Sequence, residues 1–564
     1  MEKRLGTVRR NPVLGVGAVA GLVERRSTRL SCLLRASGRM GNPRAMAATA
    51  VTRTVISALV VAPAAVVAAV LVTPWCLCAC AIPLVFFWGS ELGLRDAAQQ
   101  RKEGGERELP YFSVIASVLA GAGLPLHSIL KGLAAAEGFP FLRKEAMLVE
   151  RDVAIFGMHP TDALERLASA HPSKKLAGFL LGYTSKARSG GDTPGFLTGE
   201  SGSLLRELED GWENYATRVG VVGSLMITVF GVVPLLLMVV GIFSPQTSTV
   251  GLLLFAGLCV PLVTAGLVLM SGRMQPVHDE ALHGAMARGL LCAALGGAVG
   301  AALGVVWVAV ALALFSFFAA YGFDVRAQLK RAKSFDDGLF RFMKDLLDYV
   351  RQEYDLARAV VSIDASCHYP REFSAALSKL STQLRGGVPL DQARVDAPTR
   401  LGKLVFLMLG EMGRSGGGTV DTVYQVSRFA SMMGAMKEKV AAEVKPYLLL
   451  SYIAPGLLAF GVTFVESVLS TVGRSYGAGL AALHLDATQG ASVPPGMSQV
   501  SDLLIVVSAA ALGLIGAKVA DLTVKNTIRA ALNVAIATGA VAAMTFLGPH
   551  FLPQLFPASQ AVGR

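Results

Sequence analysis

The 564-residue sequence has few charged residues, and long stretches of it have none. Asp, Glu, Lys and Arg make up 16% of the chain, hydrophobic residues make up 53%, and the mean hydropathy is +0.53. These values exclude an ordinary soluble globular protein. Runs without any of the four charged types include 54–90, 219–272, 289–323, 446–465, 503–517 and 530–551. Because a spanning helix needs about 20 apolar residues, the sequence predicts an all-α, polytopic membrane protein.

Motifs for enzymatic chemistry are also missing. The chain has no G-x-x-x-x-G-K-[ST] loop to cradle ATP, so it is not expected to be a motor itself. It also lacks H-E-x-x-H and paired C-x-x-C knuckles. We therefore expect no catalytic residue, no cofactor and no enzymatic activity.

Metal ligands and intramembrane charges are equally scarce. The seven cysteines indicate no disulfide framework, and Cys76, Cys78 and Cys80 would diverge by about 200° from one to the next on a helix. His278 and His283 are five residues apart and splay in the same way, so no metal site is expected. Glu466 is the one ionisable candidate near a membrane run, which gives a transporter or channel little support.

The net charge of +12 is concentrated at the N-terminus. Residues 1–53 hold 11 basic and 2 acidic residues, whereas 91–218 hold 15 and 17, and 324–445 hold 19 and 15. A basic tail before a membrane run indicates a cytoplasmic anchor that is attracted to anionic membrane lipids. Without interleaved aromatic residues it does not indicate nucleic-acid binding. The short apolar stretch at 13–23 lacks a convincing cleavage site and is expected to be retained.

The uncharged runs and the positive-inside rule predict about nine spans in the cell membrane, with the N-terminus and both charged regions in the cytoplasm. We expect breaks at Pro74 and at 244–248, and a hairpin in 289–323 that turns near 300–304. The expected domains are a cytoplasmic tail (1–53), a membrane hairpin (54–90), a first module (91–218), about four spans (219–323), a second module (324–445), and about three spans (446–564) around an outer loop (471–500).

The tetrapeptide Arg-Ser-Gly-Gly occurs twice, at 188–191 and 414–417, once in each module. Other turn residues align at offsets that drift from 230 to 226: Gly157 with Gly387, Pro160 with Pro389, Asp162 with Asp391, Pro172 with Pro398, and Gly182 with Gly410. Pro starts helices and Gly ends them. Each copy is therefore predicted to contain a Gly-Pro turn, a short helix, a second Pro, a longer apolar helix and the glycine pair, as one small all-α module displayed twice.

The repeated glycines Gly190, Gly191, Gly416 and Gly417 are interpreted as structural turns that need positive φ. Consecutive glycine amides could instead form an anion-binding nest. Asp192 follows the first pair and would repel an anion, which favours the turn.

The first module contains a stretch in which charges of both signs alternate around an apolar core: Arg143, Lys144, Glu145, Glu150, Arg151 and Asp152. One interpretation is an ordinary helix with a buried stripe and a solvated face. The other is a docking face for a partner protein. Both remain open from the sequence.

Several segments of the first module together carry a family resemblance: 108–111, 120–125, Glu145, 150–152, 156–157, 171–173, 182–183 and 189–192. The chain resembles the type II secretion F domain family, in the two-domain archaeal form found in the platform of the archaellum and of archaeal type IV pili. The resemblance extends over roughly 109–546. The second module is more divergent, with Gly418 at the place of Asp192.

The resemblance implies a non-enzymatic platform protein that lies in the cytoplasmic membrane, as a homodimer, beneath a filament. Such a platform contacts a hexameric secretion ATPase through its helical modules and couples the ATPase cycle to insertion of pilin-like subunits. The mixed-charge stretch is then a hypothetical ATPase contact. A polytopic transporter or another membrane enzyme with two cytoplasmic modules is the alternative of a different class.

Overall fold

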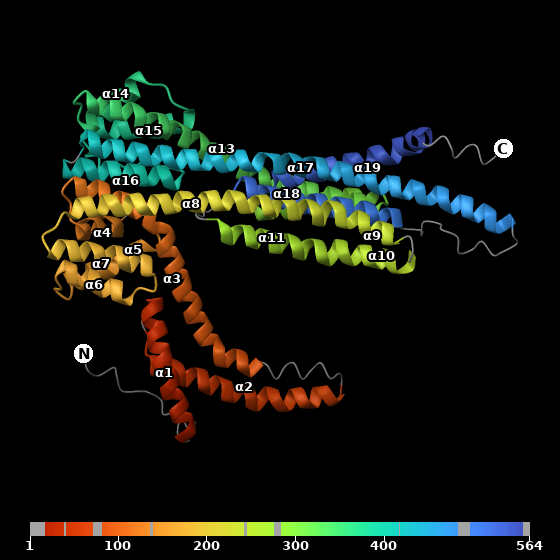
Figure 1. The fold of residues 1–564 in the computed structure, drawn as a ribbon, viewed down its shortest axis with the longest axis horizontal. Coiled ribbons are helices and arrows are strands. Elements are labelled where there is room, and N and C mark those ends of the chain that lie inside the picture. The colour runs from red at the N-terminus through yellow and green to blue at the C-terminus, as the bar shows by residue number, and fades with distance from the viewer. Residues whose placement is uncertain are drawn as a thin grey trace. The chain divides into compact units, whose positions relative to one another are not determined.

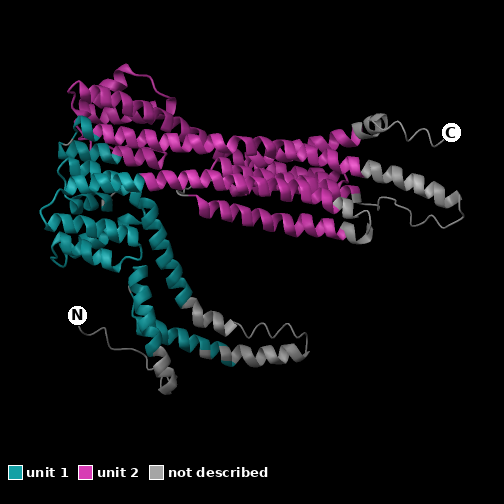
Figure 2. Ribbon diagram, in the orientation of Figure 1, with its two compact units in different colours: residues 1–205, 407–422 teal, residues 206–406, 423–564 magenta. Residues whose placement is uncertain are grey.

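A computed structural model describes residues 17–38, 41–71, 82–135, 139–241, 245–275, 282, 284–416, 418–482 and 497–555 (Figure 1). Every regular element in these ranges is a helix, which confirms the predicted all-α fold. Two compact units are present (Figure 2): unit 1 holds 1–205 and 407–422, and unit 2 holds 206–406 and 423–564.

Unit 1 contains the N-terminal helices and most of the first module. Its elements are α1 (Gly17–Ser37), α2 (Pro43–Leu71), α3 (Ile82–Gly121), α4 (Leu126–Ala135), α5 (Leu142–Ala154), α6 (Pro160–Ala170), α7 (Lys174–Arg188), the start of α8 (Thr193–Ile227), the end of α16 (Arg400–Ser415) and the start of α17 (Val420–Ala482). Leu30 and Leu34 of α1 are buried against Ala47 of α2 and Leu94 of α3. The described part of the basic N-terminal region is therefore helical and packs on α3 of the first module.

Unit 2 contains the second module and the main membrane bundle. Besides the remainder of α8, α16 and α17, it comprises η3 (Thr228–Val232), α9 (Val233–Gly241), α10 (Pro245–Leu254), η4 (Phe255–Cys259), α11 (Val260–Met274), α12 (Met286–Ala302), α13 (Val306–Arg351), α14 (Leu356–Ser366), α15 (Arg371–Arg385), α18 (Met497–Ala520) and α19 (Ile528–Leu555). The π-helical turns η3 and η4 join α8 to α9 and α10 to α11 without a break.

Several helices are long and apolar enough to cross a membrane, which confirms a polytopic membrane protein. Among the described residues they are Thr193–Leu237, Val250–Met274, Val306–Arg351, Val420–Val465, Ser498–Ala520 and Ile528–Phe546, and α12 is a shorter apolar helix. The apolar window of α18 is 78% buried, against 17–33% in the others, so α18 is the enclosed helix of the bundle. The predicted pair of spans in 54–90, with its break at Pro74, includes residues 72–81, outside the described ranges.

The apolar region 289–323 turns back on itself between α12 and α13. The turn lies at residues 303–305, where Gly304 has φ +72°. A side chain at Gly300 would collide with the backbone of Ala309, so the two helices approach closely. A single tilted helix would not bring these residues together. At the other predicted break, α9 ends at Gly241 and α10 begins at Pro245.

The three long helices α8, α13 and α17 continue from a charged module into an apolar region without interruption. The boundaries expected at 218, 324 and 445 therefore mark a change of composition inside a helix. A helix of n residues is a rod of about 1.5n Å, so each module is joined to a membrane segment by a continuous rod.

The two modules share a helix plan. Helices α3, α4, α5, α7 and α8 of the first correspond in order and spacing to α13, α14, α15, α16 and α17 of the second. The turn after α3 has Gly123 at φ +86°, and the turn after α13 has Glu353 at φ +64°, at an offset of 230 residues. Ser173 caps α7 by accepting from the Leu176 N–H at 3.2 Å, and Thr399 caps α16 by accepting from the Gly402 N–H at 3.1 Å.

The short helix predicted after Pro389 in the second copy is wrong. The first copy forms α6 there, but residues 389–399 of the second copy make only a turn. One interaction of the second copy favours the extended form. The side chain of Gln383 pairs with the Arg394 backbone, accepting from its N–H and donating to its C=O, both at 3.0 Å.

Candidate functional site

Helix α5 carries all six residues of the mixed-charge stretch, but they do not share one face. Glu145 is 4% exposed and Asp152 is 5% exposed, whereas Arg143, Lys144, Glu150 and Arg151 reach the surface. Apolar burial sets this orientation, because Leu142, Ala146 and Val149 lie on the same inner face. The structure thus divides the stretch into two inward carboxylates and four outer residues.

Glu145 belongs to a buried ionic network with α3. Arg101 donates to both carboxylate oxygens of Glu145, at 2.7 and 2.6 Å, and a third donor contacts the carbonyls of Arg35 and Ala36 at the end of α1, each at 3.1 Å. Bidentate pairing of this kind is the strongest form of the arginine–carboxylate contact. It joins α1, α3 and α5 at one point.

His171 lies beside this pair with its side chain fully buried. Its Nε2 is 3.9 Å from Glu145, and its Nδ1 accepts the Ser173 N–H at 3.1 Å. Burial lowers the pKa of His171 to about 4, so the ring is neutral at physiological pH and carries its proton on Nε2. Gly105 leaves the room for this ring, since a Cβ there would lie 3.3 Å from the imidazole.

Glu108 fixes the start of α5. Its carboxylate accepts from the N–H groups of Phe141 and Leu142, the closest contacts being 3.1 and 2.7 Å. A carboxylate at a helix N-terminus satisfies free amides and complements the helix dipole. Glu108 was part of the family resemblance, but its capping role was not predicted, because it lies 33 residues before its partner.

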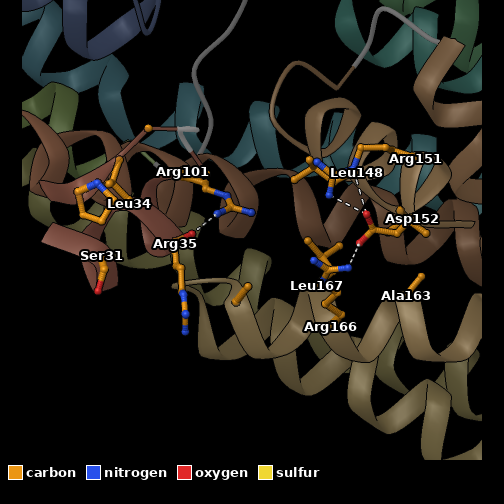
Figure 3. Close-up of a pocket in the computed structure, with 15 residues that line it drawn as sticks. Ser31, Leu34, Arg35, Arg101, Leu148, Arg151, Asp152, Ala163, Arg166 and Leu167 are labelled. Atoms are coloured by element: carbon orange, nitrogen blue, oxygen red, sulfur yellow. Dashed lines mark hydrogen bonds and ion pairs between the residues drawn. The ribbon is translucent and has the colours of Figure 1, made fainter. Parts of the chain in front are cut away.

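Asp152 lies at the far end of α5, beside a groove (Figure 3). Arg151 pairs with it at 2.6 Å and Arg166 of α6 at 3.6 Å. The groove has a volume of 580 Å³, and we call it the α5–α6 groove. It is lined by Ser31, Leu34, Arg35, Gly38, Gly41, Pro43, Arg101, Leu148, Val149, Arg151, Asp152, Ala163, Arg166, Leu167 and Ala170.

The outer face of α5 and the turn after it form a second feature, which we call the α5 surface: Phe141, Lys144, Met147, Arg151, Ile155 and Phe156. Ile155 is 73% exposed and Phe156 is 61% exposed. Lys144 lies 5.9 Å from the Phe141 ring, and Arg151 lies 5.6 Å from the Phe156 ring. Exposed apolar side chains among cations are typical of protein docking sites. Glu150 pairs with Lys131 at 3.4 Å beside this surface.

The repeated glycines end helices in matching conformations. Gly190 has φ +67° and Gly416 has φ +68°, whereas Gly417 lies outside the described residues. Gly191 donates to the Lys186 carbonyl at 3.0 Å, the bond that closes a Schellman turn. Asp192 accepts the Gly195 N–H at 2.9 Å and so caps α8. The N–H groups of Gly190 and Gly191 both donate to carbonyls of α7, so neither is open to an anion.

The candidate metal ligands and Glu466 form no site among the described residues. In the described part of the chain no three His, Cys, Asp or Glu side chains lie close enough to hold a metal ion. Cys76, Cys78, Cys80, His278 and His283 all fall outside the described residues, and Glu466 lies in α17 with a side chain that is not described.

These features define an all-α polytopic membrane protein whose first helical module carries a buried ionic core, a groove and an exposed mixed surface. Residues 112–241 match the family model described as Type II secretion system (T2SS), protein F. The match begins in α3 and ends at the end of α9, so it covers most of the first module and the membrane helix that follows. Domains of this family belong to the platform proteins of secretion and pilus-type machines. These platform proteins are not enzymes. Comparisons with curated proteins and with solved structures found no match.

Proposed function

We propose that this chain is the non-enzymatic platform of an archaeal type IV pilus-like or archaellum assembly machine in the cytoplasmic membrane. The observation that carries the proposal is the type II secretion system protein F domain at 112–241, which runs directly into a membrane helix. The repeated Arg-Ser-Gly-Gly turn and the shared helix plan support the two-domain form of this family.

The proposed role is mechanical. A hexameric secretion ATPase docks on the first module through the α5 surface, with Arg143 and Glu150 at its edge. Each change in the position of the module is passed along α8 into the bilayer, because the helix runs from Thr193 to Leu237 without a break. The moving bundle then assists the insertion of pilin-like subunits into the growing filament.

In this proposal the N-terminus and both modules face the cytoplasm, and the platform works as a homodimer. Arg206 and Thr382 are exposed positions in the two modules. Cysteines at Arg206 and Thr382, in a chain without its own cysteines, should both be labelled only from the cytoplasmic side. Labelling from opposite sides would overturn the orientation.

Affinity purification from native membranes tests the function. We expect the tagged chain to retain a secretion ATPase and pilin-like subunits, and to hydrolyse no nucleotide by itself. If the chain is a transporter or a membrane enzyme, we expect activity of the isolated chain and no retained ATPase. Substrate turnover or transport by the purified chain, with no ATPase retained, would contradict the platform.

A further inference from the structure

The α5–α6 groove has two sides that differ in sequence origin (Figure 3). Arg35 and Leu34 of α1 lie on one side together with Arg101, and Arg151, Asp152 and Arg166 lie on the other. The N-terminal helices thus complete a cavity that the first module alone would leave open. Its 580 Å³ volume is within the range of about 300–1,000 Å³ typical of binding clefts.

The groove has an excess of positive charge. Four arginines line it, namely Arg35, Arg101, Arg151 and Arg166, but only one carboxylate, Asp152. Arg101 is neutralised by Glu145 beneath it, and Asp152 is shared by Arg151 and Arg166. Among the described residues no ion pair involves the exposed Arg35, and the Arg166 side chain is 57% exposed. Arg166 contacts Asp152 at 3.6 Å and the Met158 sulfur at 3.5 Å through Nη1, which leaves its other nitrogens, and the guanidinium group of Arg35, to an incoming anion.

The rest of the lining is apolar. Leu34, Val149, Ala163 and Leu167 are each less than 10% exposed and form the groove wall together with Leu148. A free inorganic anion would pair with the arginines and make no use of this apolar wall. A ligand that carries both carboxylates and apolar side chains would cover the wall and pair with the arginines, because guanidinium groups bind carboxylates in a bidentate way.

Measured along the helices that lead to it, the groove lies farther from the predicted membrane segment than the headgroup layer extends. Arg101 follows Ser90, the last residue of the uncharged run, by eleven helical residues, or about 16 Å. Pro43 precedes the run by eleven residues, or about 16 Å. The headgroup layer extends only about 5–7 Å beyond the hydrocarbon on each face. This distance favours a protein ligand over a lipid.

We propose that the α5–α6 groove receives an acidic, partly apolar segment of the partner protein that docks on the first module. Arg35 and Arg166 pair with its carboxylates, and the apolar wall holds its hydrophobic side chains. The inference rests on the proposed docking at α5 but does not depend on which protein is the partner. It also gives the N-terminal helix a role, because α1 supplies one of the two available arginines.

Binding of a defined probe tests the chemistry of the groove. The probe is a short fluorescent peptide of alternating Glu and Leu, added to the full chain in neutral detergent and followed by anisotropy. Arg35→Gln and Arg166→Gln should each weaken binding at least about tenfold, because each removes a charge-assisted hydrogen bond. A peptide with Gln in place of Glu should not bind.

Arg44→Gln is the matched control. Arg44 lies on the neighbouring helix, its side chain is 77% exposed, and it contacts Glu24 at 3.8 Å without lining the groove. This variant should bind the peptide as the wild type does. Unchanged peptide binding in the Arg35→Gln, Arg166→Gln double variant would overturn the proposal. So would full competition by millimolar phosphate, which indicates a simple anion site, or loss of binding in nanodiscs of anionic lipid, which indicates a lipid site.

Partner capture separates this inference from the proposed function. If the wild type retains a secretion ATPase and the double variant loses it while Arg44→Gln keeps it, both proposals are supported. If the ATPase is retained equally by the double variant, the groove inference fails and the platform function stands. If no ATPase is retained but the peptide still requires Arg35 and Arg166, the platform function fails and the acidic-ligand groove stands.

Discussion

The two modules share a helix plan but have different cores. In the first module Arg101 and Glu145 form a buried ion pair, and the neutral ring of His171 lies beside it. In the second, aromatic rings fill the centre, and Phe373 lies 5.2 Å from Phe335 and 5.4 Å from Phe342. The same backbone arrangement is therefore compatible with an ion pair at this place and with aromatic side chains in its stead.

The alignment shows how one core replaces the other. The buried positions of α5, namely Leu142, Glu145, Ala146 and Val149, have the spacing of Phe373, Ala376, Leu377 and Leu380 in α15. Ala376 thus stands where Glu145 does. With the register set by the turns at Gly123 and Glu353, Phe335 stands where Gly105 leaves room for His171.

This difference indicates where specialised function lies. Apolar residues can replace a buried ion pair at no loss of stability, so the second module shows that the fold does not need an ion pair at this position. The first module keeps them beside the groove and beneath the α5 surface. We infer that the first module is the docking module and that the second is mainly a packing module.

The largest expected loss of stability follows from breaking the buried Arg101–Glu145 ion pair. Arg101→Met leaves the Glu145 carboxylate buried without its partner and should destabilise the first module by about 3–5 kcal/mol. Arg331→Met, at the aligned position of the second module, removes a side chain that is 68% exposed and should change stability by less than about 0.5 kcal/mol. Hydrogen exchange of each module in the purified full chain measures both values, and equal effects would remove the distinction between the cores.

The next effect depends on pH and should be confined to the first module. The pKa of His171 is about 4 in the folded chain and 6.5 in the unfolded one, so between these values only the unfolded chain binds the proton. The contribution of neutral His171 to the free energy of unfolding is therefore complete above pH 6.5. It is lost as the pH falls towards 4, by about 3 kcal/mol in total. His171→Ala, the residue found at Ala397 of the second module, should flatten this part of the hydrogen-exchange profile. A profile unchanged by the substitution would show that His171 is not the titrating group.

The smallest effect should be the same in both modules. A side chain at Gly190 or Gly416 would meet no atom within 4 Å, so only the positive φ opposes it. Gly190→Val and Gly416→Val should each cost about 1–2 kcal/mol, and Asn should cost less because it tolerates this conformation. If phosphate stabilises the wild type and valine costs nothing in its absence, the glycines form an anion nest and not a turn.

Local patterns predicted much of the fold. Uncharged runs marked the membrane helices, and Gly304, Gly190 and Gly416 lie at turns because glycine adopts positive φ without strain. The pattern could not show that Glu145 faces inward, since its partner Arg101 lies 44 residues away. Nor could it show that α1 closes one side of the groove, because that depends on tertiary packing of Leu30 and Leu34. The helix that we wrongly expected after Pro389 does not form, because the side chain of Gln383, on another helix, bonds to the Arg394 backbone.

The central claim is that partner docking belongs to the first module. The most direct measurement compares retention of the secretion ATPase by two charge-reversed chains at low salt. One chain carries Lys144→Glu and Arg151→Glu on α5. The other carries Lys379→Glu and Arg385→Glu on α15, where Lys379 and Arg385 are exposed. We predict strong, salt-sensitive loss of the ATPase from the first chain and normal retention by the second. Equal loss from both chains, or loss from the second alone, would contradict the claim.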